Sequence, residues 1–166
     1  MKDNIVLIGM PGVGKSTVGV ILAKMIGYQF TDADLLIQKQ EGKLLHEIIA
    51  EKGTDGFIEI EERVNASIEA SHTIIATGGS VVYGKKAMEH LSRIGTVVYL
   101  KVPYDTLEKR LEDIKGRGVV LKEGQTLRTL YDERTPLYEK YAAIEFSEDG
   151  LNVEQTVEKL LERLNK

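Results

Sequence analysis

A glycine-rich segment near the N-terminus, Gly-Met-Pro-Gly-Val-Gly-Lys-Ser at residues 9–16, constrains the fold more than any other part of this chain. It follows an apolar run at residues 4–8 that is typical of a strand buried in a parallel sheet, and it precedes apolar residues at helical spacing. The glycines let the backbone wrap so that several N–H groups point at one anion, and the following helix adds its positive end. The pattern is that of a P-loop, a cradle for nucleotide phosphates.

The P-loop positions have distinct expected roles. The nucleotide-binding residues that we predict here are Gly12, Val13, Gly14, Lys15, Ser16 and Thr17. We expect Lys15 to lie exposed in the loop and to reach the β- and γ-phosphates of ATP as a point charge. The Ser16 hydroxyl is expected to ligate Mg²⁺. A chance glycine turn before a helix is the alternative, and the strand–loop–helix context disfavours it.

Strand-like and helix-like segments alternate along the chain. Strands are predicted at residues 4–8, 29–31, 73–77, 96–100 and 143–146. Between them lie helical patterns, including two separate helices at residues 44–52 and 57–70. This alternation predicts an α/β fold with a mostly parallel sheet and helices on both faces. Because ligands bind beyond the carboxyl ends of such strands, residues 9–16, 32–34 and 77–80 should converge on one crevice.

Composition limits the classes of protein to which the chain can belong. Its 166 residues are 42% apolar and suit one compact domain over residues 1–166. The net charge of −4 does not resemble a nucleic-acid-binding surface, and no apolar run is long enough to span a membrane. The absence of cysteine excludes disulfides and thiol catalysis. We expect a cytoplasmic monomer that binds a small molecule, and neither nucleic acid nor membrane.

Two carboxylates follow the second predicted strand, Asp32 and Asp34. P-loop hydrolases usually hold their metal with an aspartate at the end of another apolar strand, and no such strand ends that way here. This favours a kinase, in which one carboxylate organises the metal shell and the other accepts a hydrogen bond from a hydroxyl. The alternative is that Asp34 is only the N-cap of a helix starting at Leu35, and the pattern leaves both open.

Together, these motifs resemble the shikimate kinase family over nearly the whole chain. The matching segments are residues 9–19, 22–23, 30–34, Ile37, Gly42, Ile48, Gly53, Phe57, Glu61, 78–79, Arg117, Arg134 and 136–138. The resemblance implies a three-layer α/β/α P-loop kinase fold with a five-stranded parallel sheet in the order 2-3-1-4-5. It also implies ATP-dependent phosphoryl transfer to a ring hydroxyl of shikimate.

The resemblance further assigns roles to the acceptor side of the site. Asp34 would bind substrate hydroxyls and act as a base, while Asp32 would sit in the outer shell of Mg²⁺ with Ser16 as direct ligand. Gly78 and Gly79 would present their backbone to the substrate. Arg134 would pair with the substrate carboxylate.

Two further arginines take roles near the nucleotide in the same way. Arg117, in a lid at about residues 114–125, would stabilise the transferring phosphoryl group and would complete a catalytic set with Lys15 and Asp34. Arg110 would lie against the adenine face. Without the resemblance, Arg110, Arg117 and Arg134 would be interpreted as solvated surface residues.

The chain departs from the family pattern on the acceptor side. Where the family has a second arginine for the substrate carboxylate, this chain has Ile58, and Ser80 replaces the third glycine of a Gly-Gly-Gly run. Losing one of two charge-assisted bonds should cost roughly 1.5–3 kcal/mol if nothing compensates. The sequence therefore leaves three interpretations open: a diverged shikimate kinase, a kinase for another small hydroxylated metabolite, and a non-catalytic nucleotide-binding protein.

Overall fold

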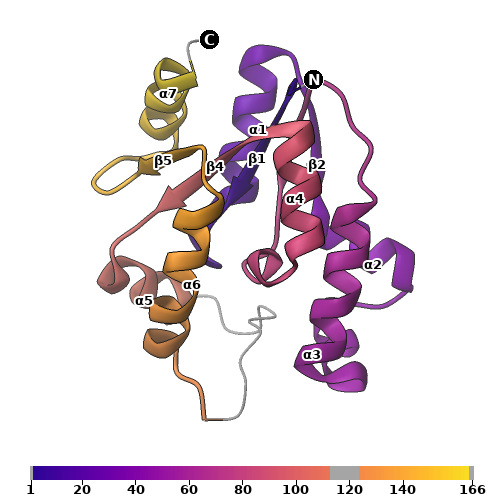
Figure 1. The fold of residues 1–166 in the computed structure, drawn as a ribbon. Helices are drawn as coiled ribbons and strands as arrows, with labels where there is room; N and C mark the ends of the chain where they lie inside the picture. The colour runs from indigo at the N-terminus through magenta and orange to yellow at the C-terminus, as the bar shows by residue number, and fades with distance from the viewer. Residues whose placement is uncertain (1, 113–123, 165–166) are drawn as a thin grey trace.

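The computed structural model describes residues 2–112 and 124–164, which form a parallel sheet covered by helices (Figure 1). The strands are β1 (Asn4–Ile8), β2 (Gln29–Asp32), β3 (Thr73–Ala76), β4 (Gly95–Lys101) and β5 (Ile144–Ser147). They pair in the order β2-β3-β1-β4-β5, and every pairing is parallel. This confirms the strand order and the α/β class expected from the sequence.

Seven α-helices and one short 3-10 turn connect these strands in the described part of the chain. They are α1 (Lys15–Ile26), α2 (Ala33–Glu41), α3 (Leu45–Ala66), η1 (Val81–Tyr83), α4 (Lys85–Ile94), α5 (Tyr104–Glu112), α6 (Leu127–Tyr141) and α7 (Val153–Leu164). The two helices expected at 44–52 and 57–70 are joined in α3, which is interrupted only by the non-helical backbone of Gly53 (φ 74°, ψ 176°) and ends four residues early.

The direction of each crossover sets the face on which its helix lies. The chain moves from β1 outward to β2 through α1, and it moves in the opposite direction from β2 to β3, β3 to β4 and β4 to β5. Since such crossovers are right-handed, α1 lies on one face, and the later crossovers pass over the other, where α4 and α6 pack against β4. The last helix, α7, packs against α1, and α3 packs against α4. None of the helices in residues 2–112 and 124–164 is long and apolar enough to cross a membrane.

Two separate groups of apolar side chains fill the interior. The larger group surrounds β1, whose residues 4–8 are all buried between β3 and β4. The smaller group lies between α2 and α3 and consists of Ile37, Ile48, Phe57 and Val64. Ile58 is half-buried and packs against this second group. The second core holds α2 and α3 together beside the carboxyl edge of the sheet.

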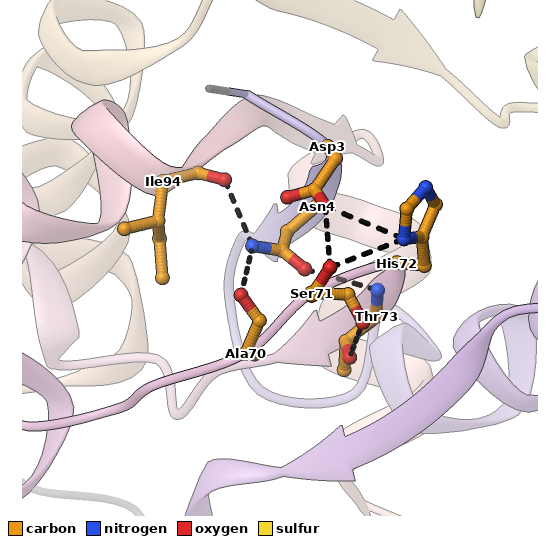
Figure 2. A network of polar contacts seen from close by, with 7 residues as sticks. All are labelled: Asp3, Asn4, Ala70, Ser71, His72, Thr73 and Ile94. Carbon is orange, nitrogen blue, oxygen red and sulfur yellow. Dashed lines mark hydrogen bonds and ion pairs between the residues drawn. The ribbon is translucent and has the colours of Figure 1, made fainter.

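A buried asparagine ties together the opposite, amino edge of the sheet (Figure 2). The Asn4 side chain donates to the carbonyl oxygens of Ala70 (3.0 Å) and Ile94 (2.9 Å) and accepts from the N–H of Thr73 (3.0 Å). Beside it, the exposed Ser71 hydroxyl donates to Asp3 (2.6 Å). Ala70 and Ile94 lie just before β3 and β4, and Thr73 begins β3. The Asn4 side chain therefore joins the starts of β1, β3 and β4.

Replacing this asparagine should destabilise the fold. Asn4→Ala leaves three backbone groups without their side-chain partner, and we expect the free energy of unfolding to fall by roughly 3 kcal/mol. Urea denaturation measures this loss. The control, Ser71→Ala, removes only the exposed hydrogen bonds to Asp3 and His72 and should change stability by less than about 0.5 kcal/mol. Equal losses in the two variants would contradict the bridging role of Asn4.

Candidate active site

A cavity of about 280 Å³ lies where the carboxyl ends of β1, β2 and β3 meet. Its lining residues are Pro11, Gly12, Gly14, Lys15, Ser16, Asp34, Gln38, Leu44, Leu45, His46, Thr77, Gly78 and Gly79. All three segments that the sequence placed at strand ends therefore contribute to one crevice, as expected. The Val13 side chain is instead buried in the main core, and Thr17 is exposed on α1.

Lys15 begins α1, directly after Gly14, and the loop wraps around its side chain. Its ammonium group donates to the carbonyl oxygens of Gly9 (2.6 Å) and Met10 (2.9 Å), and the residue is only 8% exposed. The expectation of an exposed loop lysine is therefore wrong, because the loop carbonyls take up two of its three donors. Gly14 has no side chain to cap α1, so the first N–H groups of the helix are available to an anion.

Asp32 links this cradle to the start of α2. One carboxylate oxygen accepts from the Ser16 hydroxyl (2.9 Å), and the other accepts from the N–H groups of Asp34 (2.9 Å) and Leu35 (3.3 Å). The N-cap of α2 is therefore Asp32 and not Asp34, which corrects the alternative interpretation of the sequence. Asp34 follows in the first turn of α2 and lines the cavity.

The pairing of Ser16 with Asp32 fits a Mg²⁺ site, because Mg²⁺ prefers a few oxygen ligands together with water and phosphate oxygens. Among residues 2–112 and 124–164, no group of three or more histidine, aspartate or glutamate side chains comes together as a complete protein cage. The hydroxyl and the carboxylate would therefore share the ion with the phosphates of a bound nucleotide.

A second cavity of about 20 Å³ adjoins the first and reaches deeper, toward α3 and α6. Phe57, Glu61, Ser80 and Arg134 line it, together with residues shared by both cavities. The chain passes very close to these side chains at Gly78 and Gly79. A methyl group on Gly78 would lie 2.7 Å from carboxylate oxygens of both Asp34 and Glu61, and one on Gly79 would lie 2.9 Å from the Arg134 guanidinium. Because these two glycines have no side chains, the carboxylates of Asp34 and Glu61 and the guanidinium of Arg134 can all approach this segment.

Arg134 is a buried residue of this second cavity, only 1% exposed. Its Nε donates to the Tyr83 hydroxyl (3.4 Å), and its guanidinium lies over the Tyr83 ring. One turn later on α6, the buried Tyr138 hydroxyl donates to the carbonyl oxygen of Gly79 (2.6 Å). The interpretation of Arg134 as a surface residue is therefore wrong. Sequence reasoning gave Tyr138 no role, although its spacing of four from Arg134 placed both on one helix face.

The other two predicted arginines have different outcomes. Arg110, on α5, donates to Glu148 (2.8 Å) and to the carbonyl oxygen of Gly12 (3.3 Å), which places it beside the P-loop. Burial raises the pKa of Glu148, whose pairing with Arg110 opposes that rise. Sequence reasoning missed Glu148, which no motif singles out. Arg117 and most of the expected lid lie outside the described residues.

Glu61 is the most strongly perturbed acid of the site. Its side chain is fully buried, and one oxygen accepts from the Ser80 hydroxyl (2.5 Å). Burial raises its pKa to about 8, and the nearby Asp34 carboxylate adds to the rise, while Ser80, Arg134 and Lys15 oppose it. The raised pKa therefore favours the protonated form of Glu61 at neutral pH.

This shift makes stability depend on pH. Because the folded pKa of about 8 lies above the ordinary value of 4.5, the stability that protonated Glu61 contributes is complete below about pH 4.5 and is lost as the pH rises through 8. Glu61→Gln should therefore become more stable than the parent by roughly 3 kcal/mol at pH 7, but not at pH 4.5. Urea denaturation across this range, with the exposed Glu59→Gln as control, measures the difference. A stability difference independent of pH would contradict the assignment.

Comparisons with known proteins agree with this geometry. The family model described as shikimate kinase matches residues 11–165. A shikimate kinase of Persephonella marina is 33% identical over 162 residues, which cover 97% of this chain and 98% of the relative, and one of Clostridium botulinum is 43% identical over 143 residues, 83% and 84%. The solved shikimate kinase from Acinetobacter baumannii in complex with shikimate superposes with a TM-score of 0.89, at 30% identity over 99% of this chain and 94% of that one. The chain therefore belongs to the shikimate kinase family.

Proposed function

We propose that this protein transfers the γ-phosphoryl group of ATP to a ring hydroxyl of shikimate. The observation that carries the proposal is the placement of Arg134 and Asp34 in a cavity that adjoins the P-loop. A guanidinium suits the carboxylate of shikimate, and a carboxylate suits its hydroxyls. Family membership supports the same acceptor, since a relative of closely similar structure is described in complex with shikimate.

On the donor side, the P-loop N–H groups and Lys15 bind the β- and γ-phosphates. The ammonium exchanges its bonds to the Gly9 and Met10 carbonyl oxygens for bonds to phosphate oxygens. This exchange needs little movement of the Lys15 side chain, because the carbonyls and the phosphates lie at the same loop. Ser16 and Asp32 would hold Mg²⁺, which neutralises charge on the phosphates when it is bound. These groups stabilise the negative charge that develops on the bridging and terminal phosphate oxygens during transfer.

On the acceptor side, Asp34 accepts a hydrogen bond from the reacting hydroxyl and orients its oxygen toward the γ-phosphorus. The new bond forms between that oxygen and phosphorus, the bond to ADP breaks, and the hydroxyl proton passes to Asp34. The residues supply position and charge, which account for most of the catalysis in phosphoryl transfer. The Tyr138 bond to Gly79 and the Tyr83 contacts to Arg134 hold the two substrate-facing elements in place.

Several finer assignments stay predictions. The resemblance gives Arg110 to the adenine and gives Arg117, with a lid at about residues 114–125, to the transferring phosphoryl group. The described position of Arg110 beside Gly12 supports a role near the nucleotide. The cytoplasmic location, the monomeric state and the lack of a nucleic-acid partner also stay predictions from the sequence.

The two alternative functions gain no support from the site. Lys15, Ser16 and Asp34 line one cavity, and a purely nucleotide-binding protein has no need of an acid facing its phosphate cradle. A kinase for an acceptor without a carboxylate has no use for a buried arginine at the acceptor cavity. Turnover measured with shikimate against a panel of hydroxy acids, sugars and amino alcohols tests the assignment. Faster turnover of a panel member than of shikimate would overturn it.

The P-loop lysine should be required for turnover. Lys15→Ala removes the cation from the phosphates, and we expect kcat with shikimate to fall by about 10²–10³-fold or more. A coupled assay of ADP release measures this. Because the ammonium also bonds two loop carbonyls, unfolding of the variant is followed in parallel. Lys24→Ala, exposed near the end of the same helix, should be unaffected. Near-normal turnover by Lys15→Ala would refute the kinase assignment.

Replacing the acceptor arginine, Arg134, should raise KM for shikimate and leave KM for ATP unchanged. Arg134→Lys keeps the charge but loses the planar fork that matches a carboxylate, so KM for shikimate should rise about tenfold or more while KM for ATP stays the same. Arg128→Lys, on an exposed part of the same helix, serves as the control. An equal rise in both KM values would place Arg134 at the nucleotide instead.

A further inference from the structure

Glu61 lines the acceptor cavity, and one of its oxygens has no hydrogen-bond partner among the residues that the structure describes. Oε1 accepts from the Ser80 hydroxyl at 2.5 Å, while Oε2 is buried and has no such partner. The residue is 1% exposed and lines the same small cavity as Arg134. An unpaired buried polar atom costs free energy, and one that belongs to a residue of the acceptor cavity points to a ligand group that pairs with it.

The charges around Glu61 decide which ligand that can be. Asp34 approaches from α2, Lys15 from α1 and Arg134 from α6, while Ser80 approaches from the segment before η1. An anionic Glu61 would face the Asp34 carboxylate across Gly78. Burial and this neighbour together raise the pKa of Glu61 to about 8, which favours the carboxylic acid form at neutral pH. Because Oε1 already accepts from Ser80, the proton of the acid form would sit on Oε2, the oxygen that has no partner among the described residues.

Two departures from the family pattern bear on Glu61. Ile58 precedes it by one helical turn, packs against the second apolar core and offers no donor to an acceptor carboxylate. Ser80 occupies the position of the third glycine in the family pattern, and its hydroxyl gives Glu61 a partner that a glycine could not provide. From the sequence alone, each of these departures is interpreted as a separate loss from the acceptor site. In the fold, Ser80 bonds to the Glu61 carboxyl group, while Ile58 turns to the second apolar core and leaves Glu61 as the acid of α3 that lines the acceptor cavity.

We propose that Glu61 and Ser80 form a neutral hydrogen-bonding pair that binds the acceptor carboxylate beside Arg134, with Glu61 donating through Oε2. The proposal rests on the proposed function and names how the site recognises its acceptor. Arg134 supplies the charge, and Glu61 supplies a second donor that replaces the one that Ile58 lacks. A carboxylic acid donating to a carboxylate is a strong, charge-assisted bond, so this pair can compensate for much of the missing guanidinium.

This recognition should fail at alkaline pH. Once Glu61 loses its proton, the donor disappears and the acceptor carboxylate faces a second anion. KM for shikimate should therefore rise above about pH 8, approaching tenfold per pH unit, while KM for ATP changes little. Glu61→Gln keeps a neutral side chain with one acceptor and one donor. Its KM for shikimate should lie a few-fold above that of the parent at pH 7, because an amide is a weaker donor, and should stay flat to pH 9.5.

The experiment is a set of pH profiles for KM and kcat, measured from pH 6 to 9.5 with shikimate and with ATP. The proteins are the parent, Glu61→Gln, Ser80→Ala and the control Glu59→Gln, which changes an exposed acid of the same helix. Glu59→Gln should reproduce the parent profile. Ser80→Ala should raise KM for shikimate several-fold at pH 7 and should move its alkaline rise to higher pH, because the Ser80 hydrogen bond lowers the pKa of Glu61.

A readout independent of activity accompanies the kinetics. Infrared difference spectra of the parent against Glu61→Gln at pH 7 should show the carbonyl band of a protonated carboxyl group, and this band should vanish above about pH 9. An identical alkaline rise in KM for the parent and Glu61→Gln, or the absence of the band at pH 7, would overturn the proposal. Failure of the proposed function is distinguishable, since it would appear as no shikimate turnover by the parent at any pH.

Discussion

The two halves of the active site depend on one carboxylate, that of Asp32. It holds the Ser16 hydroxyl of the phosphate cradle with one oxygen and caps the start of α2 with the other. A helix cap normally serves its helix alone, and here the same group also orients a phosphate-site hydroxyl. Because Asp34 lies in the first turn of that capped helix, the position of the acid proposed to bind the acceptor is coupled to the phosphate cradle. The distance between the acceptor hydroxyl at Asp34 and the phosphates at Ser16 would thus be set by residues 32–34.

Close approach at the end of β3 completes this arrangement. Gly78 and Gly79 allow Asp34, Glu61 and Arg134 to reach one short segment, and Tyr138 fixes that segment by its bond to the Gly79 carbonyl. Each of these side chains comes from a different helix, or from a different part of the chain, and is held by packing from a buried core. A site assembled in this way favours the protonated form of Glu61 beside another acid, because Glu61 is buried away from water.

The sequence predicted the features that depend on local pattern. The P-loop, the five strands with their order and the convergence of three strand ends follow from periodicity, glycine placement and the family resemblance, and the structure confirms them. It did not predict the features that depend on which group reaches which partner. The tucked Lys15 ammonium, the cap on Asp32 and the burial of Arg134 result from contacts between segments far apart or from the path of the loop. The pairing of Ser80 with Glu61, 19 residues apart, is invisible to any local pattern.

The second apolar core has a consequence for how the molecule opens. Ile37, Ile48, Phe57 and Val64 form a cluster separate from the main core, and the helix that carries three of them is interrupted at Gly53. A cluster of four side chains stabilises its surroundings less than the group around β1 does, so α2 and α3 should open in native-state fluctuations at a lower free energy than the sheet. Amide exchange in these helices would then report acceptor binding separately from global unfolding. We therefore expect the half of the molecule proposed to hold the nucleotide to be stiffer than the half proposed to admit the acceptor.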